Sequence, residues 1–310
     1  MGIINLSIKL GEIRSNIQLI SLLSPAFSLK INDLLNLSIQ FNKPSNFVLS
    51  ERLLLIVALV EYCHINKVEI AIDITGENSF ASRVNFYKLL GFDFKEDYVR
   101  RKSVGRFIEI KKFNQNSIYQ LQEEINMILY QIKSISKEVL QLLFYCLNEI
   151  MDNVINHATI GSGWVSAQYF PLLKEIRLII CDNGIGIHDA LTKNPQSKYQ
   201  HLSEVEALKE CIERGVTNGK GLGFGLFATA QFILKNKGHL LIYSGNYHLM
   251  NKTDTYEVSK GDFWQGTLIQ LRIKTNNAVN YKDIMPQHHT LPDDYNFFVE
   301  KYFGDDNELW

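Results

Sequence analysis

Three short polar segments limit the fold of this chain more than any other feature, because each stands where a regular element is expected to begin or end. They are Asn148–Ala158, Cys181–Ile187 and Gly219–Leu226, in that order. The first carries acid, amide and imidazole side chains within a helical pattern, the second follows an apolar strand pattern, and the third is a glycine-rich loop before a second helix. Together they predict that a helix, a strand end and a loop meet at one pocket.

The first segment belongs to a helix expected from about Lys137 to Ala158. Glu149, Asn153 and His157 recur every four residues, so they advance only about 40° per step and share one stripe beside the apolar side. The Asn153 oxygen suits Mg²⁺, and Glu149 can orient or deprotonate an attacking group. His157 is expected either to approach phosphates or to hydrogen-bond at the helix end. Taken alone, this motif also fits a solvated polar face.

The second segment follows an apolar strand expected over Glu175–Cys181. Asp182 stands at its end, where ligands of α/β proteins tend to bind. A carboxylate there can accept a hydrogen bond from the amino group of adenine, whereas guanine would present a carbonyl. Gly184 and Gly186 allow the backbone to pass close to such a ring. Taken alone, Asp-Asn-Gly is also a common turn.

The third segment alternates glycines before a helix expected over Ala228–Leu234: Gly219, Gly221, Gly223 and Gly225. Exposed amides and a helix N-terminus can hold phosphates, and Lys220 adds a positive charge. The loop is not a Walker A motif, because Gly221 rather than Ser or Thr follows the lysine.

In this order the segments resemble the N, G1 and G2 boxes of the Bergerat-fold ATPases, the group of type II topoisomerases, Hsp90, MutL, sensor histidine kinases and anti-sigma kinases. Gly266-Thr267, before the apolar run Leu268–Ile273, resembles the final Gly-Thr of the family, whose hydroxyl helps bind adenine. The resemblance implies ATP or ADP as ligand, Mg²⁺ as the metal with Asn153 as its protein ligand, and a lid over residues 188–218. In that lid Ser203 is expected to cap a helix, with Glu206 as its partner.

The expected fold class is α/β, with a C-terminal Bergerat-fold α/β sandwich and a smaller N-terminal α/β domain. The boundaries are 1–115 for the N-terminal domain, 116–136 for a linker or dimerisation helix, 137–274 for the ATPase domain and 275–310 for an acidic aromatic tail. The tail is expected to be a docking segment or a surface helix.

The N-terminal domain resembles a STAS domain, the small α/β module of anti-anti-sigma factors. Strands are expected over Leu35–Phe41, Lys67–Ile74 and Arg106–Phe113, with helices from Ser50 to about His64 and over Ser82–Leu90. An accessory domain without chemistry is the alternative. An acetyltransferase is disfavoured, because no pyrophosphate-binding Arg-x-x-Gly-x-Gly/Ala loop precedes Tyr87–Phe92.

Within the family, the pattern Glu149-x3-Asn153-x3-His157-Ala158 is most similar to anti-sigma-type serine kinases. The helix expected over Ser117–Ser134 lacks a histidine, which disfavours a self-phosphorylating histidine kinase. The short tail after residue 274 disfavours topoisomerases, Hsp90 and MutL. The resemblance therefore implies a protein that hydrolyses ATP or transfers its γ-phosphate to a protein partner, such as a STAS protein. If the N-terminal half is that partner in cis, Ser50 is the candidate acceptor, although it also fits a helix N-cap. An ATP-gated binding or dimerisation module with negligible turnover stays open.

Composition excludes several other classes. The formal net charge is −1 and the one basic cluster is Arg100-Arg101-Lys102, so nucleic-acid binding is disfavoured. The sequence shows neither a signal peptide nor a long uncharged apolar run, which predicts a cytoplasmic protein without a membrane segment. Four scattered cysteines fit buried thiols rather than disulfides or a zinc site.

Overall fold

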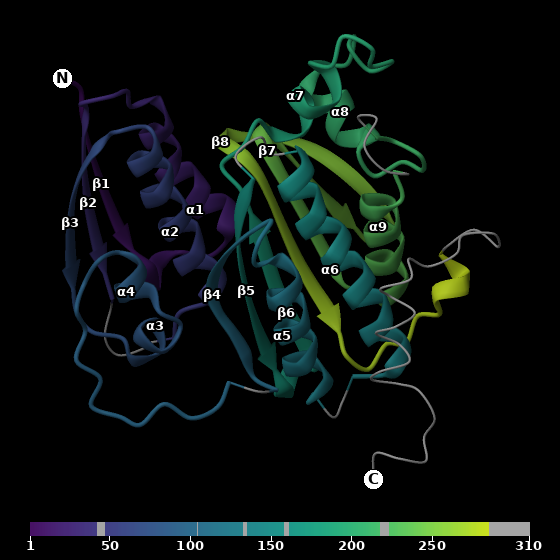
Figure 1. The fold of residues 1–310 in the computed structure, drawn as a ribbon, viewed down its shortest axis with the longest axis horizontal. Coiled ribbons are helices and arrows are strands. Elements are labelled where there is room, and N and C mark those ends of the chain that lie inside the picture. Colours follow the sequence, from purple (N-terminus) through teal and green to yellow (C-terminus); the bar gives the residue numbers. More distant parts are fainter. Residues whose placement is uncertain (42–46, 104, 133–134, 158–160, 218–222, 285–310) are drawn as a thin grey trace.

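The computed structural model describes residues 1–41, 47–103, 105–132, 135–157, 161–217 and 223–284. These residues form two sheets, with strand orders β1-β2-β3 and β4-β5-β6-β8-β7. Figure 1 shows four layers: the small sheet, the helices α1 and α2, the large sheet, and the helices α5, α6 and α9. The α/β fold class expected from the sequence is confirmed.

The N-terminal unit alternates strands with helices: β1 (Ile3–Lys9), α1 (Asn16–Leu23), β2 (Leu34–Gln40), α2 (Ser50–Ile65), β3 (Glu69–Thr75), α3 (Ser79–Arg83) and α4 (Phe86–Leu89). Its three strands are parallel, which requires crossover connections of the kind that α1 and α2 provide. β1 and α1 were not among the expected elements. The single helix expected over Ser82–Leu90 is divided, because Asn85 adopts a left-handed φ of 68° between α3 and α4.

The remaining elements are β4 (Phe107–Asn114), α5 (Ile118–Tyr130), α6 (Lys137–His157), β5 (Ser162–Phe170), β6 (Glu175–Cys181), α7 (Gly186–Thr192), α8 (Glu204–Glu210), α9 (Gly225–Asn236), β7 (His239–Lys252) and β8 (Thr255–Lys274). Short 3₁₀ helices cover Leu10–Glu12, Ser24–Ser28, Pro171–Leu173 and Tyr281–Asp283. All neighbouring strands of the large sheet are antiparallel. β4 precedes the expected boundary at residue 115, yet it hydrogen-bonds to β5 at the edge of this sheet.

The large sheet is buried on both faces, which explains why β6 is apolar at nearly every position. Leu178 and Ile180 pack in the core beneath α5, α6 and α9, whereas Ile179 and Cys181 pack in the core that contains α2. α2 is buried at every position from Leu53 to Val60, because it lies between the two sheets. The two halves of the chain therefore share one core.

Two expected helix starts had different outcomes. The N-cap role expected of Ser50 is wrong: Leu49 occupies the N-cap position without a side-chain cap, and Ser50 is the first helical residue, only 3% exposed. The capping box expected at Ser203 and Glu206 is confirmed at the start of α8. Ser203 is exposed at the surface, whereas Ser50 lies in an apolar interior where packing decides the helix start.

Candidate functional site

Asp182 is a buried acid at the end of β6. Asp182 is only 3% exposed, and its Oδ1 accepts a hydrogen bond from the Gly184 amide at 2.7 Å. The Asp182 amide donates to the Thr267 carbonyl at 2.9 Å. Burial raises the pKa of the Asp182 carboxyl to about 7, against the lowering effect of backbone hydrogen bonds from Gly184 and Thr267. A desolvated carboxyl of this kind gains most from one further hydrogen-bond donor.

Gly266 of β8 lies directly against this acid. Its φ is +86°, and a Cβ there would lie 2.3 Å from the Asp182 carbonyl oxygen and 2.7 Å from Oδ1. No side chain fits at that distance, so the glycine is what lets β8 approach the loop after β6. Thr267, the next residue and an expected adenine contact, is thereby brought beside Asp182.

The loop from Asp182 to Gly186 is held by three side chains whose role the sequence analysis missed. Ser244 Oγ accepts from the Ile187 amide at 2.9 Å and donates to the Gly266 carbonyl at 3.0 Å. Gln265 Nε2 donates to the Gly184 carbonyl. Asn183 Nδ2 donates to the Ala58 carbonyl of α2 at 2.9 Å. In the sequence, Asn183 stands in the Asp-Asn-Gly motif and Gln265 stands just before Gly266-Thr267. Their hydrogen-bond partners, Ala58 and Gly184, are far from them in the sequence, so these contacts could not be predicted.

Gly186 is the second glycine expected to bring this loop close to a ligand. It has a φ of +77°, and a Cβ would lie 2.7 Å from Ser244 Oγ. The structure therefore requires a glycine here for packing against β7, whatever else it contributes.

Glu149 lies on α6 where that helix meets the first turn of α9. A Cβ at Gly225 would lie 2.6 Å from Glu149 Oε2 and 2.8 Å from Glu149 Cβ. Burial raises the pKa of the half-buried Glu149 carboxyl, and the neighbouring charge of Asp152 raises it further. An acid with a raised pKa is better matched to accepting a proton near neutral pH than an exposed glutamate.

Asn153 lies one turn after Glu149 on α6 and is half-buried. Among the described residues no group of three or more His, Cys, Asp or Glu side chains could hold a metal ion. A metal at this place would be shared between Asn153 and ligand oxygens, which fits Mg²⁺, since it is commonly held by few protein groups together with phosphates.

The other candidates at this end are only partly described. His157 is the last residue of α6, but its side chain lies outside the described residues, as do Lys220 and Gly221. Gly223 is described: its φ is +69°, and its carbonyl accepts from the Gly215 amide at 2.9 Å. This hydrogen bond joins Gly215 to Gly223, just before α9.

The expected lid contains α7 and α8 and is attached to the large sheet. Glu204 of α8 accepts a hydrogen bond from the Asn246 amide of β7 at 3.0 Å. Arg214 places its guanidinium 5.6 Å from the centre of the Phe224 ring, just before α9. In the structure this residue therefore contacts the start of α9.

The expected site residues fall into two groups. Asp182, Gly184, Gly186 and Thr267 gather at the end of β6, and Glu149, Asn153 and Gly225 gather where α6 meets α9. Figure 1 shows the C-terminal end of α6 and the starts of α7 and α9 at the same end of the large sheet. Over the part of the chain that the structure describes, no helix is both long enough and apolar enough to cross a bilayer.

One comparison with known proteins matches this region. Residues 138–277 match the model of the family described as histidine kinase-, DNA gyrase B-, and HSP90-like ATPases. No curated protein is similar enough to the chain to count as a match. The matched range begins in α6 and ends just after β8, so it contains every expected site residue. Residues 138–277 are thus similar to this family of ATPase domains, which supports the expected resemblance to Bergerat-fold ATPases.

Proposed function

We propose that this protein binds Mg²⁺ and ATP at the end of β6 and either hydrolyses ATP or transfers its γ-phosphate to a protein. The observation that carries the proposal is the environment of Asp182. This acid is buried, its pKa is raised to about 7, and its carboxylate accepts backbone hydrogen bonds from Gly184 and Thr267. The amino group of adenine supplies the further donor that such a carboxyl favours.

Each remaining residue has a role in this proposal. Glu149 is the base that orients or deprotonates the attacking group, and Asn153 contributes an oxygen to Mg²⁺. Gly223 and Gly225 contribute backbone amides at the start of α9 to the phosphates, with Lys220, Gly221 and His157 as further contacts. When bound, Mg²⁺ neutralises phosphate charge. Phosphoryl transfer depends mainly on such positioning and charge neutralisation.

Calorimetry with purified full-length protein tests the nucleotide site. ADP with Mg²⁺ is expected to bind more tightly than GDP, because guanine presents a carbonyl to Asp182. Asp182→Asn is expected to weaken ADP binding about tenfold or more, since a charge-assisted hydrogen bond is lost. Asp73→Asn, on the exposed strand β3, is the matched control. Wild-type ADP affinity in Asp182→Asn, or equal affinity for GDP, would overturn the adenine assignment.

Labelled ATP distinguishes hydrolysis from transfer. The γ-phosphate is expected to appear either as free phosphate or on a serine of an added partner, for which STAS proteins are the first candidates. Label that stays on ATP under all conditions would contradict both reactions.

A second candidate function is an ATP-gated binding module, and the hydrogen bond from Asn183 to Ala58 favours it. Through this contact the loop beside Asp182 is joined to α2 of the N-terminal unit. A ligand that moves the loop would therefore change the N-terminal unit as well. Tight ATP binding without turnover, together with nucleotide-dependent capture of a partner or a nucleotide-dependent homodimer, would select this candidate over an enzyme.

A further inference from the structure

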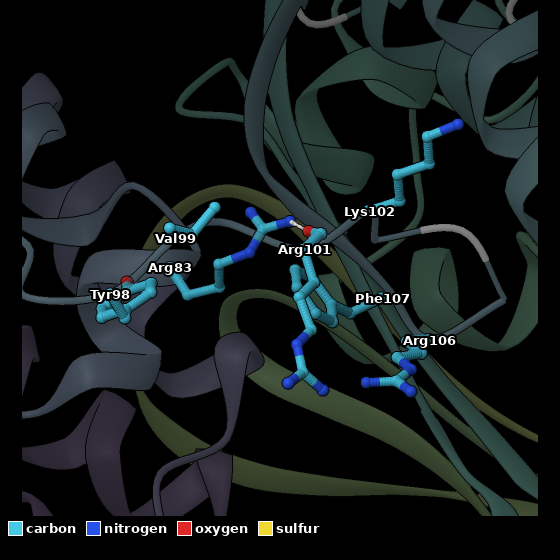
Figure 2. Close-up of a pocket in the computed structure, with 7 residues that line it drawn as sticks. All are labelled: Arg83, Tyr98, Val99, Arg101, Lys102, Arg106 and Phe107. Atoms are coloured by element: carbon cyan, nitrogen blue, oxygen red, sulfur yellow. Dashed lines mark hydrogen bonds between the residues drawn. The ribbon is translucent and has the colours of Figure 1, made fainter.

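A second pocket lies between the N-terminal unit and β4. It has a volume of about 510 Å³, and Figure 2 shows the residues that line it, among them Arg83, Tyr98, Arg101, Lys102, Arg106 and Phe107. Phe107 pairs with Gln168, and Gln168 pairs with Arg177 near the start of β6. The pocket is therefore at the opposite end of the large sheet from Asp182, and it is separate from the nucleotide site.

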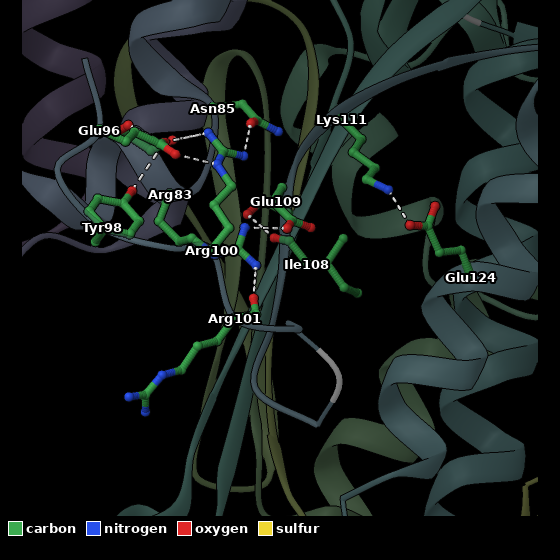
Figure 3. Close-up of polar contacts among 12 residues, drawn as sticks. Arg83, Asn85, Glu96, Tyr98, Arg100, Arg101, Ile108, Glu109, Lys111 and Glu124 are labelled. Carbon is green, nitrogen blue, oxygen red and sulfur yellow. Dashed lines mark hydrogen bonds and ion pairs between the residues drawn. The ribbon is translucent and has the colours of Figure 1, made fainter. Parts of the chain in front are cut away.

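Arg83 of the pocket lining and two basic residues outside the lining have acidic partners. Arg83 pairs with Glu109 at 2.6 Å, Arg100 with Glu96 at 2.6 Å and Lys111 with Glu124 at 2.5 Å. Figure 3 shows these pairs, which involve residues of α3, of the loop between α4 and β4, of β4 and of α5. They leave little net charge on the surface next to the pocket.

Three basic side chains of the pocket differ from these neighbours. Arg101, Lys102 and Arg106 are exposed, and within the described residues their side chains make no ion pair or hydrogen bond. Figure 2 shows the guanidinium groups of Arg101 and Arg106 on the same side of the Phe107 ring, whereas the Lys102 ammonium is directed away from it. Two arginines that line one pocket thus have no carboxylate partner among the described residues.

A hydrogen bond from Arg83 holds the backbone at Arg101. The Arg83 guanidinium donates from Nη2 to the Arg101 carbonyl at 2.7 Å and lies 4.7 Å from the centre of the Phe107 ring. Its ion pair with Glu109 is largely buried, with side chains only 14% and 13% exposed. A binding group on such a fixed backbone loses less entropy when a ligand binds.

We propose that this pocket binds a phosphate monoester on a compact ligand, with Arg101 and Arg106 as the phosphate contacts and Lys102 at the rim. A guanidinium offers two parallel donors that match phosphate oxygens. The apolar surfaces of Val99 and Phe107 accommodate the body of the ligand, and a volume of about 510 Å³ is within the usual range for small ligands.

The charge distribution favours a compact ligand over a nucleic acid. Binding along a nucleic-acid backbone depends on a continuous run of free cations, whereas Arg83 of the pocket and Arg100 of the same loop are paired with Glu109 and Glu96. The phosphate has two sources with the same chemistry, a free metabolite or a phosphorylated side chain of a protein.

Calorimetry on the full-length protein tests the proposal with inorganic phosphate, O-phosphoserine and a short phosphoserine peptide as probes. Saturating ADP is present throughout, so that any nucleotide site is filled and does not contribute. O-phosphoserine is expected to bind, and Arg101→Ala and Arg106→Ala are each expected to weaken it about tenfold or more. Lys95→Ala removes an exposed charge from the same loop outside the pocket lining and is expected to leave the affinity unchanged.

Further variants and probes separate the alternatives. Arg101→Lys keeps the charge but loses the guanidinium fork, so intermediate affinity supports two-point phosphate binding. Tighter binding of the peptide than of O-phosphoserine indicates a protein source, and equal binding indicates a metabolite. Absence of binding by all three probes, or equal weakening by Lys95→Ala, would overturn the proposal. Because ADP binding is measured independently, failure of this site is distinguishable from failure of the nucleotide site.

Discussion

Asn183 Nδ2 donates a hydrogen bond to the Ala58 carbonyl at 2.9 Å, across 125 positions of sequence. Ala58 lies in the middle of α2 and is fully buried, and Asn183 is only 8% exposed. The residue next to Asp182 is therefore anchored on the N-terminal unit. The loop that carries Asp182 is part of the interface between the two halves of the chain.

Asn183→Ala is expected to affect stability and nucleotide binding together. The buried donor is lost, which costs about 1–2 kcal/mol of unfolding free energy, and the loop beside Asp182 loses its contact with α2. Urea unfolding and ADP calorimetry measure the two effects.

The matched control is Asn36→Ala. Asn36 Nδ2 donates to Asn5 Oδ1 at 2.7 Å on the small sheet, so this variant removes one Asn hydrogen bond far from the loop. We expect a small loss of stability and unchanged ADP affinity. If Asn183→Ala lowered stability but bound ADP as the wild type does, the contact would be structural only.

The raised pKa of Asp182 predicts that the stability of the protein depends on pH. Burial raises its pKa from 3.8 to about 7 in the folded protein, so between these values the folded state binds more protons than the unfolded state. Stability from this group is therefore largest at low pH, falls as pH rises through that window and levels off above pH 7, by at most about 4 kcal/mol. Urea unfolding at pH 5, 6, 7 and 8 measures this fall.

Asp182→Asn isolates this contribution, because burial also raises the pKa values of Glu51 and Glu149 and these acids act in the same direction. The difference in unfolding free energy between wild type and Asp182→Asn is expected to change with pH. A difference that stays constant from pH 5 to 8 would show that Asp182 does not titrate as stated.

The sequence predicted the parts of the ATPase domain whose signals are local. β6 was expected over Glu175–Cys181 and is found there. α6 was expected from Lys137 to Ala158 and is described to His157. Both have long apolar patterns, and the polar motifs at their ends are contiguous in sequence.

Contacts between distant segments could not be predicted. Gln265 holds Gly184 and Asn183 holds Ala58 because separate strands and helices pack together, and no local pattern encodes such pairings. β4 was assigned to the N-terminal half for the same reason: its strand pattern was visible, but its partner β5 was not. The unusual burial of α2 on all sides likewise depends on the second sheet.

Glu149→Gln is expected to separate turnover from binding. The amide keeps the shape of the side chain beside Gly225 but cannot accept a proton, so ATP turnover is expected to fall about 100-fold or more, while ADP affinity changes little. Phosphate release and calorimetry measure the two properties. Glu138→Gln, an exposed residue of the first turn of the same helix, controls for the loss of one negative charge. Turnover in Glu149→Gln equal to that of the control would remove Glu149 from the role of base.

Gly266→Ala tests the close approach between β8 and Asp182. A methyl group there would meet the Asp182 carbonyl at 2.3 Å, and the φ of +86° adds backbone strain. Gly91→Ala is the matched control, because Gly91 has a φ of +83° but no atom within 4 Å of the added Cβ. The control is expected to lose about 1–2 kcal/mol of unfolding free energy from strain alone. Gly266→Ala is expected to lose clearly more and also to lose ADP binding, since Asp182 and Thr267 are forced apart. Equal stability of the two variants, with ADP affinity retained in Gly266→Ala, would show that the backbones do not meet as the structure describes.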